Sequence, residues 1–342
     1  MKQKNLNAKH NSFLQDKLIL SIYSSFEQII QQYINNKKFV VCVSGGPDSL
    51  ALAYCAKVYS EKFKSPCFFI IVDHGIRTNS SKEAKEVQDN LLKISASAKI
   101  LKVKKKISTS IQKNARDHRY QLISDFCKKH KISFMLTAHH LDDQIENFYI
   151  RLSRGSGLYG LSSMKVIEKN THNINVLRPF LQQSKKELIH VAKKVFKTFV
   201  KDPSNTNDAF LRSRIRKLKS SLAKEGLDQN RILKTISNLS SAKEAVDFFV
   251  HQARKKYIHS SSKNTIQIDR NLFTKQPFEI TYRVMADLIR AKSGKDYPPR
   301  STGLEYLIGT IRQKNFSKVT LGGFVFSLSK NKINMSKEHR NA

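Results

Sequence analysis

The stretch VVCVSGGPDSLALAY, from Val40 to Tyr54, interrupts an apolar run with Ser-Gly-Gly-Pro-Asp-Ser before apolar residues resume at helical spacing. The apolar run predicts a buried strand, and residues 49–62 predict a helix. Two glycines allow backbone N–H groups to approach a ligand where a Cβ would obstruct it. The following helix adds unpaired N–H groups and the positive end of its dipole. The stretch therefore predicts a phosphate site at the end of a strand.

Strands and helices alternate along the first half of the chain. The pattern predicts a helix at 12–34 and then four strand–helix pairs: 38–44 with 49–62, 67–73 with 81–97, 99–103 with 110–129, and 132–137 with 141–153. Such alternation favours an α/β fold with a parallel sheet covered by helices on both faces. Ligands of these sheets bind beyond the carboxyl ends of the strands. The unusual polar clusters of this sequence fall at those ends.

The pattern changes near residue 205. Shortly after this residue, the basic helical segment AFLRSRIRKLKSSLAKEG begins. Helical periodicity then continues to about residue 292, and a further helix is expected near 302–313. We expect four regions: an N-terminal helix in 1–36, a catalytic domain in 37–217, a linker in 218–230, and a smaller, mostly helical domain in 231–342. A short β hairpin after residue 317 is expected to end the last region.

The 342 residues carry a net charge of +35, which fits a polyanionic partner such as nucleic acid. A general bias toward lysine is the alternative explanation. No apolar run reaches the roughly 18–20 residues of a membrane span, and the N-terminus lacks a signal core. The four cysteines form no Cys-x-x-Cys pair. A reduced, cytoplasmic protein without a membrane segment or a disulfide framework is therefore expected.

The residues of the opening stretch suggest how phosphate is bound. No Gly-Lys-Ser/Thr follows the glycines, so the loop differs from the common P-loop and gives less reason to expect γ-phosphoryl transfer. Asp48 could hold Mg²⁺ on the phosphates, and the hydroxyls of Ser44 and Ser49 could bond phosphate oxygens. The alternative is a tight turn in which Asp48 or Ser49 caps the helix.

The segment SGGPDS, residues 44–49, resembles the SGGxDS pyrophosphate loop of the ATP pyrophosphatases, the PP-loop superfamily. The resemblance implies an adenine nucleotide alpha hydrolase-like fold and cleavage of ATP between its α- and β-phosphates. On its own, this motif leaves several reactions open: amidation of acids, thiolation of tRNA, and transfer of lysine to tRNA.

Further motifs narrow the choice. In their order and spacing they are similar to those of the tRNA(Ile)-lysidine synthetase family, over residues 38–217 closely and over the C-terminal third only loosely. The motifs are VDHG (72–75), NARDHRYQLI (114–123), LTAHHLDDQIEN (136–147), RGSGLYGLSSM (154–164), LRPFL (177–181) and DPSN (202–205). Two residues depart from the family pattern, because Asn147 replaces a usual Thr and Ser213 a usual Asn.

Acidic and basic side chains cluster after the fourth strand. Asp142 and Glu146 are four residues apart and share one helix face, where a cation would relieve their repulsion. That cation could be the substrate lysine ammonium or Mg²⁺, and a solvated acidic helix start is the alternative. Two adjacent histidines, His139 and His140, diverge and have no third ligand at metal spacing, so zinc is not expected. Arg116 and Arg119 could bond phosphate or RNA, or lie on a solvated face.

The resemblance implies roles for particular residues. It implies catalytic roles for Asp48, Asp143 and Glu146, with Mg²⁺ at Asp48. It implies that ATP is bound by Ser44, Gly45, Gly46, Pro47, Asp48, Ser49, Asp73, His74 and His139. The resemblance and the residue patterns together suggest a further set of residues for binding lysine or tRNA. These are Arg119, Asp142, Asp143, Glu146, Arg154, Asp202, Asn205, Arg212 and Arg216.

The reaction implied is the formation of lysidine at the wobble cytidine of the isoleucine tRNA with a CAU anticodon. ATP first adenylates O2, and the L-lysine ε-amine then attacks C2, releasing AMP. The modified tRNA would read the codon AUA in place of AUG. The C-terminal domain would bind the tRNA. Alternatives are a tRNA thiolase, another adenylating ligase, or a basic RNA-binding protein without catalysis. The oligomeric state stays open, with a homodimer as one option.

Overall fold

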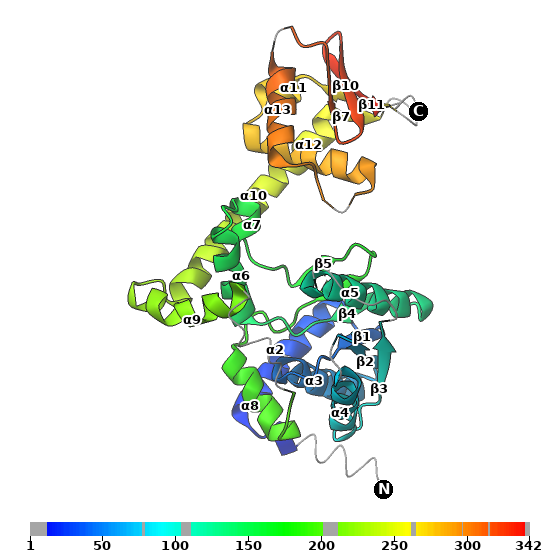
Figure 1. The fold of residues 1–342 in the computed structure, drawn as a ribbon, viewed down its shortest axis with the longest axis vertical. Coiled ribbons are helices and arrows are strands. Elements are labelled where there is room, and N and C mark those ends of the chain that lie inside the picture. Colours follow the sequence, from blue (N-terminus) through cyan, green and yellow to red (C-terminus); the bar gives the residue numbers. More distant parts are fainter. Residues whose placement is uncertain are drawn as a thin grey trace. The chain divides into compact units, whose positions relative to one another are not determined.

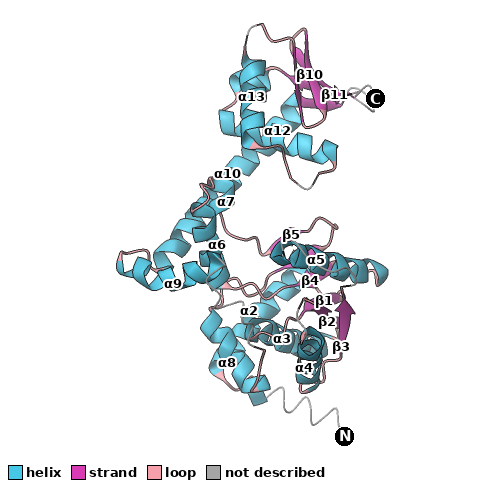
Figure 2. Ribbon diagram, viewed as in Figure 1, coloured by secondary structure: helices cyan, strands magenta, loops and turns pink. Residues whose placement is uncertain are grey.

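The computed structural model describes residues 12–76, 79–103, 111–200, 211–260, 265–295, 297–313 and 315–338. The chain divides between Ile236 and Ser237 into two compact units. A single helix, α10 (Gln229–Tyr257), crosses this division and contributes to both units. Figure 2 shows that each unit contains its own sheet.

A six-stranded sheet forms the centre of the first unit (Figure 1). The strand order is β3-β2-β1-β4-β6-β5, and only the pairing of β5 with β6 is antiparallel. The strands are β1 (Phe39–Cys42), β2 (Cys67–Asp73), β3 (Ala98–Lys102), β4 (Phe134–Leu136), β5 (Ile167–Lys169) and β6 (Asn175–Leu177). The predicted α/β fold with a largely parallel sheet is confirmed.

Helices cover both faces of this sheet. Alternate strand residues point to opposite sides: Val41 and Leu136 join the core beneath α2, α3, α4 and α8, whereas Val40 and Met135 pack with residues of α5. The helices of this unit are α2 (Lys17–Tyr33), α3 (Pro47–Phe63), α4 (Ser80–Leu92), α5 (Ile111–Lys129), α6 (Leu141–Leu152), α7 (Leu158–Leu161), α8 (Lys185–Phe196) and α9 (Leu211–Lys224). Both faces of the central strands are buried, which explains why β1, β2 and β4 are apolar runs without alternation.

The direction of strand addition reverses at β1. The chain adds β2 and β3 on one side of β1 and then returns to place β4 on the other side. At such a switch point the loops that follow the two neighbouring strands diverge to opposite faces and leave a crevice. The loop of residues 44–46 follows β1, and residues 137–140 follow β4. The fold therefore brings the two most polar motifs of the sequence together.

The second unit combines helices with an antiparallel sheet of order β7-β8-β11-β10-β9. Its helices are α11 (Asn271–Lys275), α12 (Phe278–Ser293) and α13 (Ser301–Arg312). Its strands are β7 (Ile258–Ser260), β8 (Thr265–Asp269), β9 (Lys318–Leu321), β10 (Phe324–Ser329) and β11 (Lys332–Lys337). The helices were expected, but the hairpin predicted after residue 317 is one part of a larger sheet. Ile268, Phe326 and Ile333 bury its inner face against α12 and α13.

The expected linker at 218–230 is mostly helical. Residues 218–224 belong to α9 and 229–230 to α10, so only residues 225–228 separate the two helices. A hydrogen bond from the Tyr149 hydroxyl of α6 to the carbonyl of Leu227, 3.1 Å long, ties this turn to the first unit. Within the described ranges, no helix has the length and apolar content needed to cross a membrane.

Candidate active site

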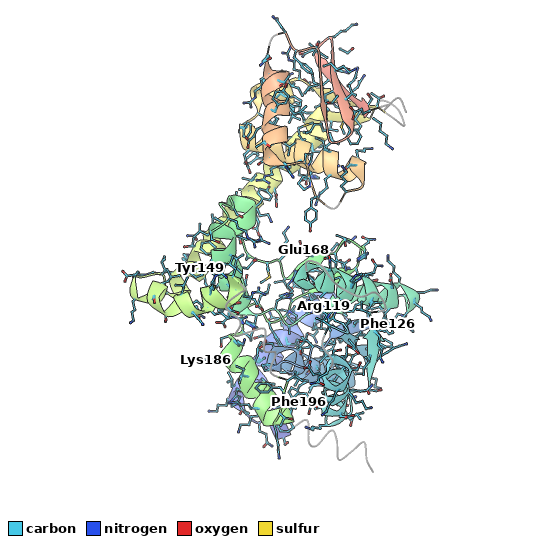
Figure 3. The ribbon with its side chains drawn as sticks, viewed as in Figure 1. Arg119, Phe126, Tyr149, Glu168, Lys186 and Phe196 are labelled. Carbon is cyan, nitrogen blue, oxygen red and sulfur yellow. The ribbon has the colours of Figure 1, made fainter. Side chains whose placement is uncertain are left out.

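A cleft of about 670 Å³ lies at the switch point between β1 and β4. Its walls come from the ends of β1, β2 and β4 and from α4, α5 and α9. Figure 3 labels Arg119 on α5, one of the side chains in this wall. The predicted site residues that line the cleft are Ser44, Asp48, Ser49, Asp73, His74, Arg119, His139, Asp143 and Arg212.

The loop after β1 is held in shape by Ser49. The Ser49 hydroxyl accepts hydrogen bonds from the backbone N–H groups of Ser44 (3.2 Å) and Gly45 (3.1 Å), and it donates to the carbonyl of Gly46 (3.0 Å). The Ser44 hydroxyl lies 3.3 Å from the same oxygen. Ser49 thus has a loop-forming role beside the phosphate-binding role expected from sequence. Pro47 occupies the first turn of α3, where its missing N–H costs nothing.

The two loop glycines are not equivalent. Gly45 has φ of +87°, and a Cβ there would overlap the side chain of Val87 and lie 3.2 Å from Cγ2 of Val200. Gly46 has φ of −70°, and the nearest atom to a Cβ there is 4.0 Å away. The backbone conformation and the close packing therefore require glycine only at position 45.

Gly45→Ala is expected to lower the free energy of unfolding by about 1–3 kcal/mol, because alanine is strained at this φ and meets Val87. Urea unfolding of the purified protein measures the loss. Gly46→Ala is the matched control and is expected to cost less than about 1 kcal/mol, the usual effect of changing a helix N-cap. An equal loss in both variants would contradict the distinct role of Gly45.

Asp48 has one carboxylate oxygen available for a cation. Its Oδ1 is buried and has no hydrogen-bond partner among the residues that the structure describes, and its Oδ2 lies 3.6 Å from Nε2 of His140. Mg²⁺ usually takes one or two carboxylates together with phosphate oxygens and water. The described residues contain no group of three or more His, Cys, Asp or Glu side chains that could bind a metal ion without other ligands. Asp48 does fit a Mg²⁺ ion that is also bound by the phosphates of ATP.

His140 was not predicted as a site residue, yet it lies among three carboxylates. It is only 2 % exposed, and its Nε2 is 3.5 Å from Oδ2 of Asp143. Its Nδ1 is 4.0 Å from Oδ2 of Asp142. Burial alone would lower the pKa of His140, but Asp48, Asp143 and Asp142 together raise it above its ordinary value.

Asp73 and His74 end β2 at the rim of the cleft. Asp73 accepts hydrogen bonds from the N–H of Gly75 (3.0 Å) and the hydroxyl of Ser81 (2.6 Å), so it connects β2 to the start of α4. Burial opposes ionisation, but these bonds keep the pKa of Asp73 below its ordinary value. The Nδ1 of His74 is buried without a partner. Burial and then Arg119 lower the pKa of His74, so its neutral ring is available to a ligand.

His139 also presents a neutral ring to the cleft. Its Nδ1 lies 2.8 Å from the Thr137 hydroxyl. Burial, with nearby arginines led by Arg178, lowers the pKa of His139 to about 3. Arg116 and Arg119 lie 5.2 and 5.8 Å from the Tyr120 ring, and all three residues line the cleft. The positive charge of this wall suits phosphate groups.

The acidic face of α6 meets the basic face of α9. Glu146 is 2 % exposed, and its carboxylate accepts hydrogen bonds from Nε (2.6 Å) and Nη2 (3.0 Å) of Arg216. Nε of Arg212 lies 3.1 Å from the same carboxylate. Burial alone would lower the pKa of Arg216, but the bonds to Glu146 raise it. Two of the four arginines predicted for the site, Arg212 and Arg216, therefore contact the predicted acid Glu146.

A second contact between these helices involves Asp142. Lys219 Nζ lies 2.8 Å from its Oδ1, and the backbone N–H of Lys185 donates to its Oδ2 at 2.9 Å. Burial would raise the pKa of Asp142, but these partners lower it. Asp142 therefore anchors α8 and α9 to α6 and does not line the cleft.

The remaining predicted residues lie elsewhere. Arg154 lies in the exposed turn after α6 and does not line the cleft. Asp202 and Asn205 fall outside the described residues. Sequence reasoning missed Arg178, which is buried and donates to the Lys165 carbonyl (2.9 Å) and to Glu168 (3.1 Å). Its place in LRPFL, directly after β6, was the available signal.

Comparison with known proteins identifies the family. A PP-loop domain model matches residues 19–222. The tRNA(Ile)-lysidine synthase of Orientia tsutsugamushi is 32% identical over 86% of this chain and 68% of its own length. That of Wolbachia pipientis wMel is 31% identical over 87% of this chain and 71% of its own length.

A solved structure confirms the fold independently. The U34-tRNA thiolase of Methanococcus maripaludis has a TM-score of 0.55 and 17% identity, over 66% of this chain and 80% of that chain. This likeness concerns the fold alone, whereas the sequence matches extend over most of the chain. The chain belongs to the PP-loop proteins and, among them, to the tRNA(Ile)-lysidine synthase family.

Proposed function

We propose that the chain makes lysidine at the wobble cytidine of an isoleucine tRNA with a CAU anticodon, using ATP and L-lysine. Membership of the family over most of the chain supports this ligase reaction. The observation that carries it is the meeting of a phosphate loop and an acidic helix at one switch point. The reaction needs this arrangement, because an ammonium site must lie beside the α-phosphate of ATP.

In the first step, O2 of the cytidine attacks the α-phosphate and pyrophosphate leaves. The start of α3 directs its N–H groups and dipole toward the phosphates, and Arg116 and Arg119 add positive charge to the facing wall. Mg²⁺ at Asp48 would offset negative charge on the departing pyrophosphate. The cytidine must be unstacked to reach the cleft, as is usual where single-stranded RNA is recognised.

In the second step, the lysine ε-amine attacks C2, the C2–O2 bond breaks and AMP leaves. The amine must lose a proton, and Asp143 and Glu146 are the candidate acceptors. Asp143 lines the cleft, whereas Glu146 is covered by Arg212 and Arg216. Asp143 is therefore the better-placed acceptor, and Glu146 is proposed to help to hold the lysine.

The net charge of +35 supports a large contribution of phosphate contacts to tRNA binding. Such binding weakens steeply as salt is added, because counterions are released when the complex forms. We assign binding of the tRNA body chiefly to the C-terminal region, residues 231–342. The proposed location is the cytoplasm, where tRNA, ATP and free lysine are present together.

The experiment that tests this function combines purified protein, Mg·ATP, labelled lysine and an isoleucine tRNA transcript with a CAU anticodon. Label should enter the tRNA with one AMP and one pyrophosphate per lysine, and a transcript without the wobble cytidine should take up none. Release of AMP without label would leave the pyrophosphatase chemistry but refute lysine transfer.

A tRNA thiolase is the main rival within the superfamily. Such chemistry usually uses reactive cysteines, and a reactive thiol needs a lowered pKa and access. Here burial raises the pKa of the Cys42 and Cys127 thiols to about 12, and it raises those of Cys55 and Cys67 as well. The cysteines are therefore poorly suited to sulfur transfer.

A further inference from the structure

One buried imidazole joins the carboxylate proposed to serve ATP to the acid proposed to serve lysine. Nε2 of His140 lies 3.6 Å from Oδ2 of Asp48 and 3.5 Å from Oδ2 of Asp143. Asp48 belongs to α3 and Asp143 to α6, so the ring spans the switch point between β1 and β4.

Both distances are longer than the 2.7–3.2 Å of a well-formed N–H···O hydrogen bond. Nε2 of His140 therefore lies between the two carboxylates without a well-formed hydrogen bond to either. The backbone N–H of His140 already holds Oδ2 of Asp143 at 3.2 Å, whereas Oδ1 of Asp48 is buried and has no partner. A cation that satisfies Asp48 would release the Nε2–H group to bond Asp143 alone and fix its side chain.

We infer that His140 is a positioning residue that couples ATP binding at Asp48 to lysine binding at Asp143. The inference rests on the proposed function, because it takes ATP and lysine as the two ligands. Nucleotide binding raises the affinity for lysine, and lysine raises the affinity for the nucleotide by the same factor. The coupling favours the state in which both ligands are bound, so that the amine is held when activated cytidine is formed.

Two matched variants isolate the Nε2 contact. His140→Gln and His140→Asn are both neutral amides, but only glutamine is long enough to place an N–H group near the position of Nε2. His140 is the N-cap of α6, and asparagine is among the most favoured residues there, so the shorter variant is expected to fold. Thermal unfolding of both variants checks this expectation.

The experiment measures binding of labelled lysine to the full chain by equilibrium dialysis. It is performed with and without Mg²⁺ and an ATP analogue whose α–β bridging oxygen is a methylene group. We expect the analogue to tighten lysine binding by about tenfold in the unmodified chain. The gain should stay above about fivefold in His140→Gln and fall below about twofold in His140→Asn, while each ligand still binds alone.

Equal coupling in the two variants overturns the inference, as does an unmodified chain that binds both ligands without coupling. The proposed function survives either result. An unmodified chain that never binds lysine refutes the function and the inference together. If His140→Asn does not fold, Asp48→Ala removes the same contact by deleting the Asp48 carboxylate. When that variant is saturated with the analogue, its affinity for lysine should rise by less than about twofold. A rise as large as in the unmodified chain would also overturn the inference.

Discussion

Asp48→Asn is expected to slow ATP-dependent pyrophosphate release by about 100- to 1,000-fold, the usual effect of removing one electrostatic group from a reaction centre. Asparagine keeps the shape of the side chain but removes the charge that would hold a cation on the phosphates. The buried Oδ1 of Asp48 has no hydrogen-bond partner among the described residues, so we expect this oxygen to act on the ligand. A coupled pyrophosphate assay with the CAU transcript measures the loss.

The matched control for this variant is Asp125→Asn. Asp125 lies on the exposed side of α5, where it bonds Gln121, and it does not line the cleft. The same chemical change there should leave the rate of pyrophosphate release within about twofold, as expected for a surface substitution. Near-normal release by a folded Asp48→Asn protein would remove Asp48 from the reaction centre.

The first unit was predictable because its signals are local. Strands β1, β2 and β4 are short apolar runs, and the loop motif directly follows β1, so strand ends and polar clusters could be matched along the chain. Strands β5 and β6 were not predicted. The switch point then follows from the alternation of strands and helices. The carboxyl ends of β1, β2 and β4 do meet the same cleft, with Asp48, His74 and His139 in its walls.

The parts that sequence reasoning missed depend on distant contacts. The helical periodicity predicted up to about residue 292 was wrong over β7 and β8, which are strands. Their pairing depends on distant residues, because β8 pairs with β11, which lies more than 60 positions later. Two adjacent histidines do diverge, but only the fold shows that the second is buried beside Asp48. Similarly, nothing local indicates that Glu146 bonds Arg216, which is 70 residues away.

Glu146→Gln is expected to destabilise the protein by about 3–5 kcal/mol, because it breaks the ion pair between the buried Glu146 carboxylate and Arg216. Lysine transfer should fall as well, since Glu146 is proposed to help to hold the substrate. A single substitution cannot separate these two effects. Urea unfolding and labelled-lysine incorporation must therefore be measured on the same preparation.

The double variant Glu146→Met with Arg216→Met separates structure from catalysis. Replacing a buried ion pair by apolar side chains of similar size is often neutral or stabilising, and Arg212, with 47% of its side chain exposed, can remain solvated. We expect stability to return to within about 1 kcal/mol of the unmodified chain, while lysine incorporation stays at least about 100-fold reduced. Recovery of both properties would show that Glu146 serves only to dock α9 on α6. Recovery of stability alone would establish that the Glu146–Arg216 pair also acts on the substrate.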